Sequence, residues 1–310
     1  MLSLKDVKLA IVTGGWSAER NENLTGARTV QKTLVENNVD AAWVEVRRGH
    51  NFIPEILQQR PDFAILCMTE EVPIQGAFDI IGIPYNGSGV LTTALCFDKQ
   101  KSKQLMVAAG IHTPAYYIFS VEDVKSILSH MDWRVIEQRI GFSFPIVVKP
   151  NACGSSVGVC LVTELAALPG ALQRAIEHSE LILIERYIQG TEVTCPVLGD
   201  RIFPAVKVQT PTGIYDYSHK EHLTASYSVI PESEKFLHVA LEEAVGILRS
   251  TFSLENIWRL DAIWDGAHLF ILEVNTLPYL GGTSGVMATS FHALNMDHYQ
   301  FLSAVIGEKL

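Results

Sequence analysis

The residues with the clearest capacity for chemistry lie in the stretch "WRLDAIWDGAHLFILEVNTLP", residues 258–278. Arg259 and Asp261 are two positions apart, as are Glu273 and Asn275, so each pair would point to one face of a strand. If the two strands form a hairpin, the four polar groups share one patch. Carboxylate and amide oxygens are ligands that Mg²⁺ prefers, usually together with nucleotide phosphates and water. A polar stripe facing solvent is the alternative, but this set of groups favours a metal site.

A second candidate is the small-residue loop in "VVKPNACGSSVGV", residues 147–159. Lys149 precedes the glycines instead of following them, and no GxGxxG spacing opens a helix, so the loop is not a Walker A motif. Two interpretations remain open. The loop is either a tight turn between two strands or a flap whose backbone N–H groups hold phosphate.

Glu185 lies in "LILIERYIQGTE", at the end of an apolar run. Carboxylates at strand ends accept hydrogen bonds from nucleotides in many sites. A single exposed glutamate is more often an ordinary surface residue. Glu185 therefore gains weight only from its context.

Composition limits the classes of partner. The chain has 310 residues, of which 48% are hydrophobic and 19% charged, which predicts a well-cored protein of two or three lobes. A formal charge of −10 argues against a nucleic-acid partner held through its phosphates. Charges interrupt any signal-peptide core and no apolar run is long enough to span a membrane, so we expect a cytoplasmic protein without a membrane partner. Five cysteines without CxxC spacing indicate neither a disulfide framework nor a zinc site.

The elements that must position these residues follow from hydrophobic periodicity. Strands alternate with helical segments in the first ninety residues, which predicts a parallel βαβ sheet. Further strands and helices predict two more lobes, the last of which contains two hairpins. The predicted strands are 7–15, 40–46, 62–68, 144–150, 157–162, 181–188, 257–264 and 268–276, with a short strand and a turn over 81–89 and a hairpin over 190–210. The predicted helices are 23–38, 91–110, 165–179 and 233–252.

Seven stretches, taken in order, carry a family resemblance. They are "GGWSAER" (14–20), "GIPYNGSGVLTTALCFDK" (82–99), "VVKPNACGSSVGV" (147–159), "ERYIQGTEV" (185–193), "YDYSHK" (215–220), "RLD" (259–261) and "LEVNTLP" (272–278). The sequence resembles the D-alanine–D-alanine ligase family of the ATP-grasp superfamily over nearly the whole chain. The resemblance implies an α/β, three-lobed ATP-grasp fold with an N-terminal parallel α/β lobe and two α+β lobes enclosing ATP. The implied domains are an N-terminal substrate-binding domain (1–97), a central lobe (98–188) and a C-terminal metal-binding lobe (189–310).

The resemblance further implies an ATP-dependent carboxylate–amine ligase. ATP would phosphorylate the carboxylate of one amino acid, and the amine of a second would attack the acyl phosphate. Two Mg²⁺ ions, which Mn²⁺ can replace, would bridge the phosphates, and the family tendency suggests a homodimer. The implied catalytic residues are Glu19, Ser155 and Arg259; the nucleotide-binding residues are Lys99, Lys149, Ser156, Glu185, Glu192 and Lys220; the substrate-binding residues are Glu19, Glu221 and Ser284; the metal ligands are Asp261, Glu273 and Asn275.

Departures from the family pattern cluster at the positions that border the second amino acid, the acceptor. The stretch "CMTEEVPIQG" (67–76) lacks a histidine, and Glu221, Tyr279 and Gly285 stand where tyrosine, glycine and leucine are usual. The ATP and metal positions all match. Our first interpretation is therefore a ligase with an altered acceptor. The alternatives are an ordinary D-alanine–D-alanine ligase of peptidoglycan synthesis and a nucleotide-binding paralogue without ligase activity.

Overall fold

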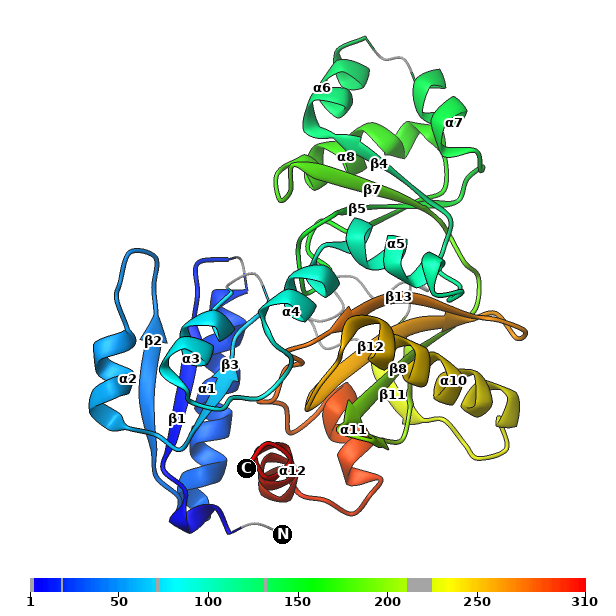
Figure 1. Ribbon diagram of the computed structural model, residues 1–310. Helices are drawn as coiled ribbons and strands as arrows, with labels where there is room; N and C mark the ends of the chain where they lie inside the picture. Colours follow the sequence, from blue (N-terminus) through cyan, green and yellow to red (C-terminus); the bar gives the residue numbers. More distant parts are fainter. Residues whose placement is uncertain (1–2, 18, 71–72, 131–132, 211–224) are drawn as a thin grey trace.

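The computed structural model describes residues 3–310 except 18, 71–72, 131–132 and 211–224. The N-terminal sheet is parallel with strand order β2-β1-β3, formed by Ala41–Val46, Leu9–Gly14 and Phe63–Cys67 (Figure 1). Every residue of β1 is buried, as expected of a parallel strand with both faces covered. Helices α1 (Arg20–Glu36) and α12 (His298–Gly307) cover one face, while α2 (Ile53–Gln59) and α3 (Gln75–Ile81) cover the other.

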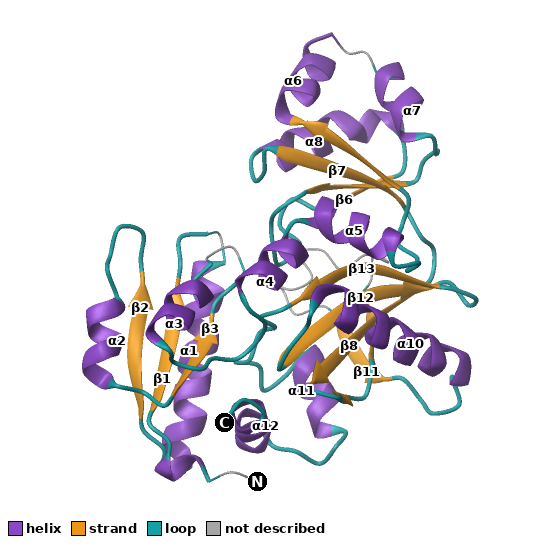
Figure 2. Cartoon of the chain, viewed as in Figure 1, coloured by secondary structure: helices purple, strands orange, loops and turns teal. Residues whose placement is uncertain are grey.

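The second sheet is antiparallel, with strand order β4-β7-β5-β6. Its strands are Tyr116–Ser120, Leu181–Arg186, Ile146–Pro150 and Cys160–Val162. Helices α6 (Val121–His130), α7 (Arg134–Ile140) and α8 (Leu168–Ile176) share its hydrophobic core, and all three lie on one side of the sheet (Figure 2). Strand β4 and helices α6 and α7 were not predicted from the sequence.

The third sheet is antiparallel, with strand order β11-β10-β8-β12-β13 and β9 paired to β8. Its strands are Ser226–Val229, Val206–Gln209, Thr191–Leu198, Ile257–Trp264, Leu269–Asn275 and Arg201–Ile202. The long helix α10 (Lys235–Phe252) packs on it, together with residues from α4 (Val90–Phe97) and α5 (Lys99–Ala108). The predicted fold class, with a parallel N-terminal sheet followed by two antiparallel sheets, is confirmed. The predicted domain limits remain predictions.

Two local expectations were wrong. The helix expected over 91–110 is divided at Asp98, which has an extended backbone. Its carboxylate accepts a hydrogen bond from Lys101 N at 3.0 Å and another from Asn151 Nδ2 at 2.9 Å. The side chain thus starts a new helix by capping it. The short strand expected over 81–89 forms only one isolated bridge, between Ala64 and Tyr85.

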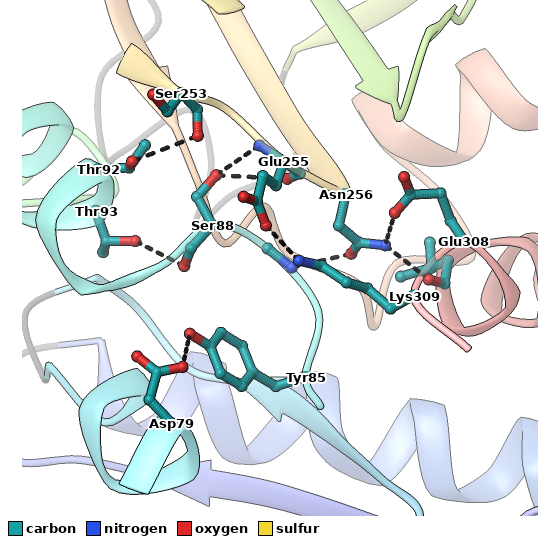
Figure 3. Close-up of polar contacts among 12 residues, drawn as sticks. Asp79, Tyr85, Ser88, Thr92, Thr93, Ser253, Glu255, Asn256, Glu308 and Lys309 are labelled. Atoms are coloured by element: carbon teal, nitrogen blue, oxygen red, sulfur yellow. Dashed lines mark hydrogen bonds and ion pairs between the residues drawn. The ribbon is translucent and has the colours of Figure 1, made fainter. Parts of the chain in front are cut away.

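A buried polar seam joins the N-terminal sheet to the third sheet (Figure 3). Asn256, which is 1% exposed, accepts a hydrogen bond from Gly87 N at 2.9 Å. Its amide nitrogen donates to Val305 O at 2.8 Å and to Glu308 Oε2 at 2.7 Å. Thr92 Oγ1 donates to Phe252 O at 2.7 Å. Because Asn256 immediately precedes β12, these contacts set where that strand begins relative to the N-terminal lobe.

The other regular elements of the described residues are α11 (Val286–His292) and two short 3₁₀ helices, Leu4–Asp6 and Leu165–Ala167. Among the helices of the described residues, none has the length and apolar character needed to cross a bilayer.

Candidate active site

One cleft of about 600 Å³ is lined by residues from all three sheets. The N-terminal lobe contributes the start of α1 and the end of β3. The second sheet contributes β5, β7 and the loop 151–158, and the third contributes β8, β10, β12, β13 and the segment 277–287. The carboxyl ends of strands and their following loops often hold ligands in this way, between lobes. Every residue predicted for the site that the structure describes lines this cleft.

A buried row of charges lies on the floor of the cleft. Glu185 on β7 is 2% exposed, with Lys149 Nζ 2.7 Å from its Oε2 and Lys103 Nζ 2.7 Å from its Oε1. Burial would raise the pKa of Glu185, but the two lysine charges outweigh it and hold the pKa below its usual range. Lys103 also donates to Thr113 Oγ1 at 2.5 Å. The arrangement fixes the direction in which Lys149 enters the cleft.

Lys99 is the first residue of α5, so the helix break at Asp98 decides where its side chain goes. Its Nζ donates to Cys153 O at 2.7 Å, in the small-residue loop, and lies 3.4 Å from Glu273 Oε2 on β13. The lysine is only 7% exposed. It therefore joins the loop of the second sheet to the strand pair of the third.

The four residues of the predicted strand patch do meet. In the register of β12 and β13, Arg259 pairs with Asn275 and Asp261 with Glu273. Arg259 donates two hydrogen bonds to Asp261, from Nε to Oδ1 at 2.9 Å and from Nη2 to Oδ2 at 2.7 Å. Asn275 Nδ2 donates to Asp261 Oδ2 at 2.9 Å. Burial alone would lower the pKa of Arg259, but the negative charge of Asp261 and its hydrogen bonds outweigh this effect and raise the pKa above its usual value. The guanidinium therefore stays charged.

The patch fits a metal ion only in part. Asp261 also accepts from Thr194 Oγ1 at 2.9 Å, so its two oxygens already serve four donors. Asn275 uses its amide nitrogen here, which leaves the amide oxygen as its metal-binding atom. Within the described residues, no group of three His, Cys, Asp or Glu side chains converges. Glu273 and Asn275 suit Mg²⁺ that takes its other ligands from phosphates and water, and Asp261 joins them only by releasing a donor.

The small-residue loop reaches across to the N-terminal lobe. Ser155 Oγ lies within hydrogen-bond reach of Glu19 Oε1, and its distance to Glu22 Oε2 is 2.9 Å. Ser155 and Ser156 both have positive φ, at 47° and 60°, which places this turn in the left-handed region. Glu19 is 5% exposed at the N-terminus of α1, where the helix dipole favours a carboxylate. The loop thus meets the N-terminal lobe at an acidic corner.

Other predicted residues are distributed as follows. Ser156, Glu192 and Ser284 line the cleft, with Glu192 on β8. Lys220 and Glu221 lie outside the described residues. The structure therefore brings together every predicted residue that it describes.

Three residues of the site were missed by sequence reasoning. Lys103 follows Lys99 by one helical turn within the predicted helix 91–110, so helical spacing was an available signal for it. Glu22 follows Glu19 by three positions, but both residues precede the predicted helix 23–38, so their shared helical face was not foreseen. Glu70 accepts a hydrogen bond from Leu277 N at 2.9 Å, and burial raises its pKa. Its role in fixing the segment 277–285 depends on a contact across 207 residues, for which a single sequence holds no signal.

Comparisons with known proteins show the family of the chain. A model of the C-terminal part of D-alanine–D-alanine ligases matches residues 105–306. The chain belongs to the D-alanine–D-alanine ligase family. A D-alanine–D-alanine ligase from Chromohalobacter salexigens is 33% identical over 92% of this chain and 89% of its own length. One from Gloeobacter violaceus is 32% identical over 98% of this chain and 100% of its own length.

Solved structures in the same family share the fold. A D-alanine–D-alanine ligase from Bacillus anthracis, complexed with ATP, superposes with a TM-score of 0.78 at 22% identity, covering 98% of this chain and 97% of that one. The VanG D-Ala:D-Ser ligase of Enterococcus faecalis gives a TM-score of 0.75 at 22% identity, covering 98% and 99%. The predicted family and enzyme class, an ATP-dependent ligase with an ATP-grasp fold, are confirmed.

The buried charge row makes a testable prediction for stability. Replacing Lys103 with methionine keeps most of the aliphatic stem but removes one of the two cations that face Glu185. We expect a loss of about 3 kcal/mol in the free energy of unfolding, as for a broken buried ion pair. Chemical denaturation measures it. The matched control is Lys101→Met on the exposed side of the same helix, which should change the value by less than about 0.5 kcal/mol. Equal effects at the two positions would contradict a stabilising role for the charge row.

Proposed function

We propose that the protein joins two amino acids in an ATP-dependent reaction that passes through an acyl phosphate. One observation carries the proposal. The cleft places the cations Lys99 and Lys149, suited to phosphates, beside the oxygen-rich pair Glu273 and Asn275, and it ends at the acidic corner formed by Glu19. Phosphate-binding and amine-binding chemistry therefore share one enclosed space.

The nucleotide occupies the side of the cleft between the two antiparallel sheets. Lys99 and Lys149 contact the phosphates of ATP, and the backbone around Ser156 covers them, with Lys220 from outside the described residues. Glu192 binds the nucleoside. Glu185, whose two oxygens each face a lysine, holds Lys149 in place. Two Mg²⁺ ions would neutralise the phosphate charge when bound, and Glu273 and Asn275 are the residues that would hold them, with Asp261 after it releases a donor.

The first amino acid, the donor, binds at the acidic corner. Glu19 accepts its ammonium group, and Ser155 orients it. One oxygen of its carboxylate attacks the terminal phosphorus of ATP, and the bond to ADP breaks. Arg259 donates the N–H of Nε and one N–H of Nη2 to Asp261. Its other three N–H groups, two on Nη1 and one on Nη2, are the ones that stabilise charge on the acyl phosphate.

The second amino acid, the acceptor, binds beside the segment 277–285, with Ser284 near its carboxylate. Its amine, after losing a proton, attacks the acyl carbon, and phosphate leaves. We propose that the acceptor differs from D-alanine, because Glu221, Tyr279 and Gly285 all depart from the family at this end. The structures of this fold include a D-Ala:D-Ser ligase as well as D-alanine ligases. D-Alanyl-D-alanine synthesis is the second candidate. We further propose that the enzyme is a cytoplasmic homodimer.

The test is an ATP-consumption screen with D- and L-amino acids, alone and in pairs, followed by mass spectrometry of the product. The proposal predicts ADP release that depends on added amino acids and a product with the mass of a dipeptide. Nucleotide binding without amino-acid-dependent hydrolysis would instead show a binding paralogue. A product that is solely D-alanyl-D-alanine would favour the second candidate.

A further inference from the structure

The ring of Tyr279 packs against a glycine on helix α1. A Cβ atom built at Gly26 would overlap the Tyr279 ring, with 2.9 Å to its Cζ and 3.2 Å to its Cδ2. A Cβ atom at Gly281 would in turn overlap the backbone of Gly26. Helix α1 and the segment 277–285 are therefore in close contact, because Gly26 leaves room for the Tyr279 ring and Gly281 leaves room for the backbone of Gly26.

The backbone on both sides of Tyr279 is anchored. Leu277 N donates to Glu70 at 2.9 Å. Leu280 O accepts from His298 Nε2 at 2.7 Å, and the other ring nitrogen of His298 lies 2.7 Å from Thr33 Oγ1 on α1. The imidazole thus ties the segment to both α12 and α1. With its backbone held and Gly26 behind it, the tyrosine ring has no room to withdraw from the cleft.

The tyrosine side chain is part of the cleft wall, and the residue is 37% exposed. Burial, followed by the charge of Glu22, raises the pKa of the phenol to about 12. It is therefore a neutral group at physiological pH, and its main contribution to the cleft is bulk.

We propose that Tyr279 is a specificity-determining residue that restricts the acceptor to amino acids with small side chains. The inference rests on the proposed function, because it assigns the segment 277–285 to the acceptor. Tyr279 and Ser284 lie in that one segment, five positions apart. The ring fills space next to the place where the acceptor binds, and a longer acceptor side chain collides with it. Glycine, alanine and serine fit this limit, whereas leucine and phenylalanine exceed it.

The direct test is the Tyr279→Gly variant. We would measure kcat/KM for acceptors of rising size, in both stereochemical forms, with ATP and the donor held at saturation. The ratio of kcat/KM for leucine to that for alanine should rise at least about tenfold, as expected when a hydrophobic pocket gains several methylenes of space. The matched control is Tyr279→Phe, which keeps the ring and removes the hydroxyl, and it should leave the ratio unchanged. An unchanged ratio in Tyr279→Gly, or an equal change in Tyr279→Phe, would overturn the inference.

A second variant tests the packing that holds the ring. Gly26→Ala favours the helix but pushes the ring further into the cleft, so kcat/KM for alanine should fall several-fold. Adding Tyr279→Gly to Gly26→Ala removes the collision and should cancel that loss. A loss that persists in the double variant would contradict the packing argument. A native enzyme that is inactive with every amino-acid pair would overturn the proposed function and this inference together, whereas an active native enzyme with an unaltered Tyr279→Gly profile would overturn this inference alone.

Discussion

Replacing Glu273 with glutamine is expected to lower kcat by at least about 100-fold, because a phosphoryl-transfer site would lose an anionic metal ligand. The glutamate lies 3.4 Å from Lys99 on the wall of the cleft, and its side chain is part-exposed. The free energy of unfolding without nucleotide should therefore change by less than about 0.5 kcal/mol. Steady-state kinetics over a range of Mg²⁺ concentrations should also show a higher Mg²⁺ requirement.

The control for this substitution is Glu242→Gln, the same chemical change on the exposed face of α10, which should leave kcat unaltered. If Glu273→Gln retained full activity and lost stability instead, the residues of β12 and β13 would form a structural polar stripe. The metal-site interpretation would then be wrong.

Replacing Lys149 with methionine is expected to weaken nucleotide binding by about 10- to 100-fold, which corresponds to one charge-assisted hydrogen bond to phosphate. Calorimetric titration with a non-hydrolysable ATP analogue measures the change. Glu185 would keep Lys103 as a partner, so the variant should still fold. Lys125→Met, on the exposed side of α6, is the matched control and should bind normally. Unchanged affinity in Lys149→Met would refute the assignment of Lys149 to phosphate binding.

Much of the fold was predictable, because the spacing of apolar residues along the sequence indicates which segments form strands and which form helices. The strand pair β12–β13 and its four polar residues followed from spacing two along a strand. The loop after Lys149 was ambiguous on its own, since glycine and serine serve turns and phosphate sites alike. Only its collinearity with six other motifs favours the phosphate-binding interpretation, which remains a prediction.

What could not be predicted depends on contacts between distant residues. Asp98 divides a helix because its carboxylate caps the following turn. The same carboxylate accepts a hydrogen bond from Asn151 Nδ2, which is 53 residues away. Glu70 binds the backbone of Leu277 across 207 residues. Tyr279 stood out in the sequence as a departure, but its effect depends on Gly26, a residue inside the predicted helix 23–38. Pairings of this kind are set by the packing of lobes and not by local propensity.

The most direct test of the acyl-phosphate reaction follows an oxygen atom. The donor amino acid is labelled with oxygen-18 in its carboxylate, and the phosphate released during turnover with ATP and the acceptor is examined by mass spectrometry. Because the carboxylate oxygen forms the bond to phosphorus and leaves with the phosphate, each phosphate should carry one labelled oxygen. Released phosphate without the label, in a reaction that consumes ATP, would contradict the proposed mechanism.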